Sequence, residues 1–271
     1  MSNVAIITGA GSGFGLELSK KLLAKDWIVY AADIDKDALA RAAEFGARPL
    51  QFDVTSDDQV NSGVAKVIAE TGRVDLMVAN AGFGHFSSIE ETSPEKVRAL
   101  FEVNVFGVER CVRAVLPQMR KQRSGRILMT ASVVAHVSLI GLGWYAATKH
   151  AVRAVANALR QEVHALGIKV SVIEPGTVRT NFDQVAFGHL RDSRTINDYD
   201  QVMNGFNKWL GGLYRNSPGP KQVVKTMFRA ATAKNPKPIY PASWDVRALK
   251  FVFLGFGRRI TDAVVLWLAK H

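Results

Sequence analysis

The 271-residue sequence contains one cysteine, Cys111, and six histidines that are scattered along the chain. A single thiol allows no internal disulfide, and no histidine or cysteine spacing typical of a metal site occurs, so we predict neither. Repeats, low-complexity tracts and linkers are also missing, which favours a single domain. The first apolar run begins at Val4, which leaves no room for a cleaved signal peptide. We therefore expect a cytoplasmic protein.

Acidic residues are scarce near the end of the sequence. Residues 201–271 contain 12 Lys or Arg against two acidic residues, whereas the first 200 residues contain 23 against 22. Two apolar groups in residues 251–268 flank Gly257-Arg258-Arg259, and neither approaches the roughly 18 residues of a membrane span. The sequence allows three interpretations of this segment: it packs on the protein or a second subunit, it lies on an anionic membrane, or it attracts acidic molecules. No nucleic-acid-binding module is evident, so we expect no nucleic-acid partner.

Short apolar runs alternate with stretches of helical periodicity along the chain. The expected strands are Val4–Thr8, Trp27–Ala32, Pro49–Phe52, Leu76–Ala79, Arg126–Thr130 and Val170–Ile173, with a short seventh at Pro238–Tyr240. Such alternation predicts an α/β fold: a Rossmann-like, doubly wound parallel sheet of about seven strands with helices on both faces. A hydrophobic content of 48% suits one large core.

A glycine-rich turn follows the first expected strand. It places Gly9, Gly11, Gly13 and Gly15 within seven positions, just before a helical pattern that begins at Leu16. Glycines let the backbone approach a pyrophosphate, and the helix N-terminus supplies free N–H groups. A turn that binds nothing is the alternative, but such a turn needs only one or two glycines. We therefore predict a dinucleotide site.

Asp33 directly follows the second expected strand and lies twenty residues after Gly13. An acidic residue at about this distance binds the ribose hydroxyls of the adenosine in dinucleotide-binding folds. Its charge would repel a 2′-phosphate, and neither Ser12 nor Ile34 supplies a cation, so we predict NAD as the cofactor. The alternative is a loop or helix-capping carboxylate, since Asp35 and Asp37 follow.

Tyr145 and Lys149 stand four residues apart, which places them on one face of a helix. We expect the lysine ammonium to lower the pKa of the phenol, so that Tyr145 exchanges protons with an alcohol or ketone. Ser132 ends the strand-like run Arg126–Ser132, at the sheet edge where α/β folds bind ligands. Asn104 and Gly107 are poor helix formers within one helical stretch and predict a local irregularity. For Asn104, an exposed side chain without a role is the alternative.

Together these motifs resemble the short-chain dehydrogenase/reductase family over most of residues 3–182. Thr8-Gly9-x-x-x-Gly13-x-Gly15 resembles its cofactor motif, and Asn80-Ala81-Gly82 resembles its motif after the fourth strand. The run before Asn80 departs mildly from the family, because it reads Val78-Ala79 where many members have a second asparagine. The resemblance implies a catalytic tetrad of Asn104, Ser132, Tyr145 and Lys149. In it, Tyr145 is the acid/base, Ser132 orients the substrate oxygen, Lys149 tunes the tyrosine and Asn104 holds water in a proton relay. The resemblance also implies the cofactor-binding positions, including those of the glycine-rich turn: Gly9, Ser12, Gly13, Phe14, Gly15, Asp33, Asp53, Val54, Asn80, Ala81, Gly82, Tyr145, Lys149, Pro175, Gly176 and Thr180.

The resemblance also divides the single domain, residues 1–271, into three parts. Residues 1–182 form the cofactor-binding and catalytic core, 183–235 a substrate lid, and 236–271 the last strand and the basic, apolar C-terminal segment. Apolar residues of the lid either line the pocket or only pack: Phe182, Val185, Phe187, Met203, Phe206, Trp209, Leu210, Leu213 and Tyr214.

The expected activity is hydride transfer between NAD(H) and an alcohol or ketone, with a hydrophobic substrate that is steroid-, retinoid- or lipid-like. Two alternatives remain: an NADP(H)-dependent ketoacyl-type reductase, and a dinucleotide-sensing protein without turnover. Val152, Val155, Leu159 and Val163 form an apolar stripe that must be buried on something. In the family this helix contributes to a subunit interface, which implies a homodimer or homotetramer.

Overall fold

Seven parallel strands form one sheet in the computed structural model, which describes residues 2–179, 188, 195–243, 246 and 258–270. In spatial order the strands are β3 (Arg48–Gln51), β2 (Ile28–Asp33), β1 (Val4–Thr8), β4 (Leu76–Ala79), β5 (Gly125–Thr130), β6 (Ile168–Glu174) and β7 (Ile239–Pro241). The predicted doubly wound fold is confirmed, and the strand bounds differ from the expected ones by at most two residues.

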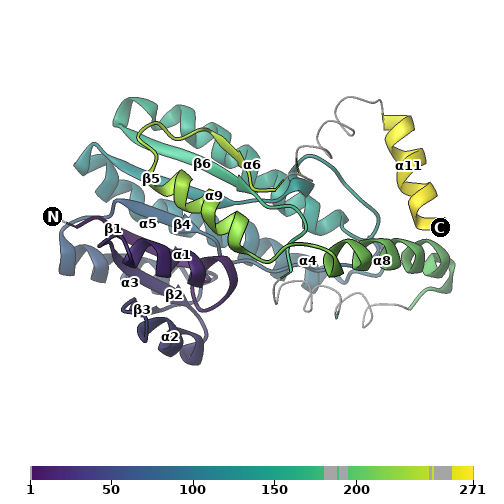
Figure 1. Cartoon of the computed structure of the whole chain (residues 1–271), viewed down its shortest axis with the longest axis horizontal. Helices are drawn as coiled ribbons and strands as arrows, with labels where there is room; N and C mark the ends of the chain where they lie inside the picture. The colour runs from purple at the N-terminus through teal and green to yellow at the C-terminus, as the bar shows by residue number, and fades with distance from the viewer. Residues whose placement is uncertain (1, 180–187, 189–194, 244–245, 247–257, 271) are drawn as a thin grey trace.

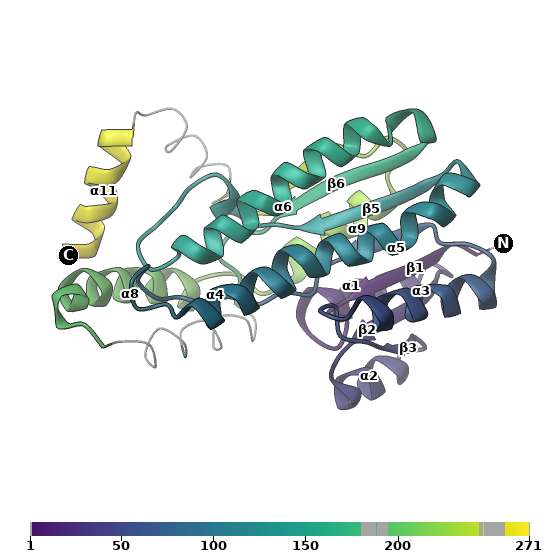
Figure 2. The same cartoon turned by 180° about the vertical axis from the view of Figure 1, so that it is seen from behind.

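Helices cover both faces of the sheet. One face carries α1 (Gly13–Leu23), α2 (Lys36–Ala43) and α9 (Lys221–Thr232), as Figure 1 shows. The other carries α3 (Asp57–Thr71), α5 (Gly107–Gln122) and α6 (Gly143–Glu162), which lie in front in Figure 2. Each face buries its own apolar core, because parallel strands with helices on both sides leave few positions in contact with water.

In the described part of the chain, three further helices lie beyond the carboxyl ends of the strands: α4 (Pro94–Phe101), α8 (Asp200–Arg215) and α11 (Arg258–Lys270). A third apolar cluster holds this region together and includes Leu100, Phe206 and Ala269. The helices α8 and α11 pack closely, since a Cβ at Gly205 would overlap the Ala269 carbonyl oxygen. None of the described helices is long and apolar enough to cross a bilayer.

The apolar stripe of α6 is buried mostly within one chain. Val152, Leu159 and Val163 pack into the core on that face of the sheet, and only Val155, 45% exposed, points outward. The stripe therefore does not by itself require a second subunit. The homodimer or homotetramer stays a prediction.

Candidate active site

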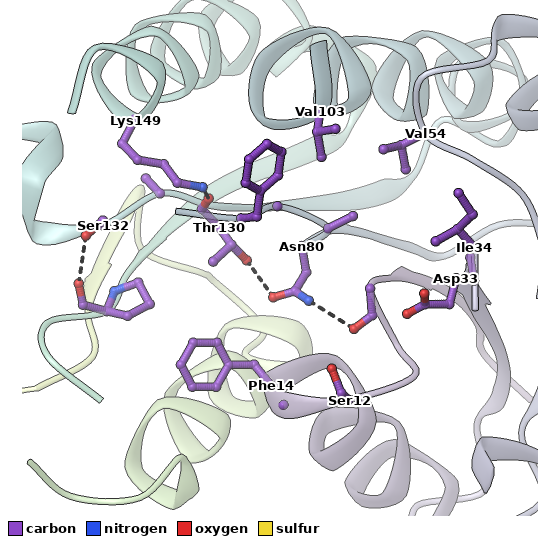
Figure 3. A pocket seen from close by; sticks show the side chains of 18 of the residues that line it. Ser12, Phe14, Asp33, Ile34, Val54, Asn80, Val103, Thr130, Ser132 and Lys149 are labelled. Atoms are coloured by element: carbon purple, nitrogen blue, oxygen red, sulfur yellow. Dashed lines mark hydrogen bonds between the residues drawn. The ribbon is translucent and has the colours of Figure 1, made fainter. Parts of the chain in front are cut away.

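A pocket of about 510 Å³ lies at the carboxyl edge of the sheet, where α/β folds bind ligands. The predicted cofactor positions that line it are Gly9, Ser12, Gly13, Phe14, Asp33, Asp53, Val54, Asn80, Ala81, Gly82, Tyr145, Lys149, Pro175 and Gly176. Figure 3 shows Asp33 and Ile34 at one end of the pocket and Lys149 and Ser132 at the other. The pocket is thus elongated, with a carboxylate and an amine at opposite ends.

Two predicted site residues do not line the pocket, and a third lies outside the described residues. Gly15 packs α1 onto the turn, because a Cβ there would overlap the Gly9 carbonyl oxygen. Asn104 is fully buried and does not reach the pocket surface. Thr180 is outside the described part of the chain.

The turn before α1 exposes backbone to the pocket. Gly9 and Gly13 adopt φ angles of +62° and +53°, a region that only glycine enters at little cost. A Cβ on Gly9 would stand 3.0 Å from the Ala81 Cα, whereas the space beside the Gly13 Cα is open. The first turn of α1 holds no acidic side chain, so the positive end of the helix dipole faces the pocket uncompensated. These features fit the diphosphate of a dinucleotide.

Asp33 is held by backbone groups at the adenosine end of the predicted site. Its Oδ2 accepts a hydrogen bond from the Gly11 N–H at 2.9 Å, and its Oδ1 accepts one from the Asp35 N–H at 3.2 Å. The helix-capping carboxylate is Asp35, which accepts hydrogen bonds from the amides of Asp37 and Ala38 at the start of α2. The capping alternative therefore applies to Asp35, while Asp33 lines the pocket.

Hydrogen bonds tie together three strand ends below the pocket. The Thr8 hydroxyl accepts from the amides of Asn80 and Ala81, each at 3.0 Å. The Asn80 side chain donates to the Thr8 carbonyl at 3.0 Å and accepts from the Thr130 hydroxyl at 3.2 Å. β1, β4 and β5 therefore end at a fixed spacing.

Tyr145 and Lys149 lie in the first two turns of α6 and face the pocket. The Lys149 Nζ stands 5.7 Å from the centre of the Tyr145 ring and donates a hydrogen bond to the Thr130 carbonyl at 3.0 Å. Ser132 lines the same end, and its hydroxyl hydrogen-bonds with Tyr145. All three residues are less than a tenth exposed. The structure thus brings the predicted Ser132, Tyr145 and Lys149 together.

Burial dominates the electrostatics of this end of the pocket. It lowers the pKa of Lys149 to about 8, because the ammonium loses water. It raises the pKa of Tyr145 well above its ordinary value, and the hydrogen bond with Ser132 offsets only part of that rise. For the chain alone, the pKa of Tyr145 therefore lies above its ordinary value rather than below it, because desolvation of the phenolate dominates.

Asn104 is fully buried in a π-helical turn, Glu102–Phe106, between α4 and α5. Its Oδ1 accepts from the Phe83 amide at 3.0 Å, and its Nδ2 donates to the Phe83 carbonyl at 2.9 Å and to the Thr148 hydroxyl at 3.3 Å. The predicted irregularity is confirmed, and the exposed alternative is wrong. Asn104 joins the segment after β4 to α6, and its relay role stays a prediction.

The lid residues divide between packing and lining. Met203, Phe206 and Leu210 are buried in the third apolar cluster, whereas Tyr214 lines the pocket. That cluster continues to Phe86, whose ring meets the Tyr145 ring edge-on at 6.2 Å between centres. Phe182, Val185 and Phe187 lie outside the described residues.

The sequence reasoning missed several lining residues: Ala32, Ile34, Phe52, Thr55, Phe83, Val103, Thr130, Ala131 and Val178. Each lies within two residues of a predicted position, so widening every motif by two residues would have found them. Thr130 matters most among them, since its carbonyl holds the Lys149 ammonium.

Comparisons with known proteins agree with this geometry. Residues 3–189 match the family model described as short chain dehydrogenase. The chain is 32% identical to the 3-ketodihydrosphingosine reductase of Bacteroides thetaiotaomicron, covering 86% of this chain and 85% of that protein. It is 31% identical to the 17-beta-hydroxysteroid dehydrogenase type 6 of Rattus norvegicus, covering 92% and 83%.

A solved structure of similar fold contains a dinucleotide. The short-chain dehydrogenase/reductase from Burkholderia phymatum, in complex with NAD, is 27% identical, with a TM-score of 0.79 over 94% of this chain and 96% of that one. Given the family model, the relatives and the shared seven-stranded sheet, this chain belongs to the short-chain dehydrogenase/reductase family, oxidoreductases that act on a CH–OH or keto group.

Proposed function

We propose that this protein catalyses reversible hydride transfer between NAD(H) and a hydrophobic alcohol and its ketone or aldehyde. The observation that carries the proposal is a single pocket with Ser132, Tyr145 and Lys149 at its buried end and Asp33 at the other. The exposed glycine backbone between these ends fits a diphosphate. A pocket that only binds a dinucleotide does not need a tyrosine, a serine and a lysine together at one end.

The charge at the adenosine end supports NAD rather than NADP as the cofactor. The Asp33 carboxylate lines the pocket and accepts hydrogen bonds from the Gly11 and Asp35 amides, which hold its negative charge where a 2′-phosphate would bind. Of the residues described as lining the pocket, only Lys149 carries a positive charge, and it lies at the end opposite to Asp33 (Figure 3). An NADP(H)-dependent ketoacyl-type reductase would need a cation near Asp33, so we place that alternative second.

When bound, the nicotinamide supplies or accepts the hydride. Tyr145 delivers the proton to the carbonyl oxygen in reduction, and its raised pKa keeps that proton on the phenol near neutral pH. Ser132 hydrogen-bonds the same oxygen and stabilises the negative charge that develops there. Lys149 holds positive charge beside Tyr145, and Asn104 fixes the segment after β4 against α6.

The residues around Tyr145 favour an apolar substrate. Phe83, Val178 and Tyr214 line the pocket, and Phe86 packs against the Tyr145 ring. Relatives with 31% and 32% identity bear the names of a steroid dehydrogenase and a ketodihydrosphingosine reductase, which supports a steroid- or lipid-like ketone. The substrate would bind between the proposed core, residues 1–182, and the proposed lid, residues 183–235.

We further propose a homo-oligomer as the working form. The outward face of α11 carries Ile260, Val264 and Leu266, each at least 40% exposed, while Val265 and Ala269 are buried. This exposed apolar face suits a second subunit, and an anionic membrane surface is the alternative. Sedimentation with anionic vesicles at low and high salt separates the two, since only the membrane interpretation predicts salt-sensitive pelleting.

The test of the activity is NADH and NADPH consumption with a panel of steroid, retinoid and long-chain ketones. We expect turnover with hydrophobic ketones and a preference for NADH. Turnover restricted to small polar hydroxyketones, added to the panel for comparison, would exclude the substrate class, and tight NADH binding with no turnover would leave a dinucleotide sensor. A preference for NADPH would contradict the role of Asp33.

A further inference from the structure

A buried carboxylate stands directly behind the pocket. Glu174 is the last residue of β6, and it is completely inaccessible to solvent. Its Oε1 lies 2.7 Å from the His136 Nε2, and the His136 side chain is only 2% exposed. A buried charge is costly unless it is paired and hydrogen-bonded, so this pair must compensate for the lost hydration.

Arg153 is the third member of the cluster. Its Nε lies 3.7 Å from the same Glu174 oxygen, and its Nη1 donates to the Ala135 carbonyl at 3.3 Å. Arg153 follows Tyr145 by eight residues and Lys149 by four, so all three lie on one face of α6. The cluster therefore connects the catalytic helix to the end of β6.

Three backbone segments that shape the pocket meet at this cluster. Glu174 immediately precedes Pro175 and Gly176, which line the pocket. His136 ends the short turn that begins at Ser132, and the Pro175 carbonyl accepts from the Val133 amide at 2.8 Å. None of the three cluster residues is among the described residues that line the pocket.

We propose that His136, Glu174 and Arg153 are positioning residues that hold Ser132 and Pro175 in register with Tyr145. The proposal rests on the proposed function, because positioning has a catalytic consequence only if Ser132 and Tyr145 act on one substrate oxygen. The Ser132 segment has no other described ionic connection to α6. A role in fold stability alone is the competing explanation.

The test compares His136→Leu, which removes the donor to Glu174, with His136→Gln, which keeps an N–H donor. We expect His136→Leu to lower kcat about 10- to 100-fold, since small misplacements of reacting groups have effects of that size. The NADH dissociation constant, measured by fluorescence, should rise by less than about fivefold, because Asp33 and the glycine turn remain in place and only Pro175 and Gly176 shift. His136→Gln should recover kcat to within about threefold of the parent.

His150→Leu is the matched control. His150 also lies on α6, next to Lys149, but its ring bonds only within the helix, to the Ala146 carbonyl at 2.9 Å. This variant should keep kcat within about twofold. The proposal is overturned if folded His136→Leu retains the parent kcat, or if His136→Gln loses as much activity as His136→Leu.

Two further readouts keep the test decisive. If His136→Leu does not fold, Arg153→Met replaces it, because Arg153 is 31% exposed and less damaging to remove; an unchanged kcat then overturns the proposal. If the parent shows no turnover, the proposed function fails, and positioning is tested alone by comparing amide hydrogen exchange in His136→Leu with that in the parent. Faster exchange in the variant, confined to residues 131–136 and 173–178, supports the positioning role. Unchanged or uniformly faster exchange contradicts it.

Discussion

The two ends of the pocket hold charges of opposite sign in different surroundings. Asp33 lies at an open end beside Ile34, which is 63% exposed. Lys149 lies at a closed end with Tyr145 and Ser132, and these three residues are 5%, 7% and 8% exposed. The aspartate is held by backbone amides, whereas the lysine is held by one backbone carbonyl.

The difference in hydration gives the two charges different functions. At the open end, water screens the Asp33 carboxylate, so its charge acts only on groups that bind next to it; in the proposed function it selects NAD over NADP. At the closed end, desolvation shifts the pKa values of Lys149 and Tyr145 themselves, and in the proposed function these two groups carry out proton transfer. The predictions on Lys149, Asp33 and pH test this division, and the prediction on Asn104 tests the residue behind the pocket; their expected effects decrease in order.

Lys149→Met removes the charge at the closed end. Turnover should fall about 10³-fold, because Tyr145 loses its cationic neighbour. At pH 7 the cofactor-free chain should nevertheless gain about 1–3 kcal/mol of stability, since burying the ammonium is unfavourable and the lost bond to Thr130 offsets part of the gain. Urea unfolding and turnover of the same variant give both values. A variant that is both inactive and strongly destabilised would contradict the electrostatic account of this end.

Asn104→Ala removes the buried side chain that pairs with the partly buried amide and carbonyl of Phe83. We expect a loss of about 2–4 kcal/mol in the free energy of unfolding, because each buried unpaired group costs about 1–3 kcal/mol. The matched control is Asn157→Ala on α6, where the amide accepts only from Arg160. Equal losses in the two variants, measured by urea unfolding, would show that Asn104 has no special structural role.

Asp33→Asn removes the charge at the open end and keeps an acceptor for the Gly11 amide. The ratio of kcat/KM for NADPH to that for NADH should rise about 10- to 30-fold, or about 1.4–2 kcal/mol, as repulsion of the 2′-phosphate disappears. Asp37→Asn, in the first turn of α2, is the control and should leave the ratio unchanged. An unaltered ratio in Asp33→Asn would mean that specificity lies elsewhere.

The pH dependence of stability gives the smallest effect. The pKa of Lys149 falls from 10.5 in the reference state to about 8 in the folded chain. Between these values the unfolded chain binds more protons, so this group makes the free energy of unfolding rise with pH, by about 1–2 kcal/mol from pH 8 to 9.5. The difference between the parent and Lys149→Met should show this rise. A difference that is flat or falls with pH would contradict the depressed pKa.

Most of the fold and the open end of the pocket followed from local sequence patterns. Gly9 and Gly13 line the pocket, as the glycine-rich turn predicted, and Asp33 lies at the end of β2, within one residue of the expected strand. Such features depend on backbone chemistry within a few residues, which one sequence displays directly.

The closed end was only partly predictable, because its properties arise from long-range burial. The spacing of Tyr145 and Lys149 placed them on one face, but the Thr130 carbonyl that accepts from Lys149 comes from another strand. Desolvation of Tyr145 depends on packing by Phe86 and the third apolar cluster, which no local pattern reveals. The cluster of His136, Glu174 and Arg153 joins three separate segments and gave no sequence signal for the same reason.

The most direct measurement is deuterium transfer from 4-deuterated NADH to a hydrophobic ketone by the parent and by Tyr145→Phe, followed by mass spectrometry of the alcohol. The parent should label the carbinol carbon, and Tyr145→Phe should do so at least about 10³-fold more slowly with its NADH affinity within about threefold of the parent. Labelling by Tyr145→Phe at a rate close to that of the parent would contradict the assignment of Tyr145 as the acid of the reaction.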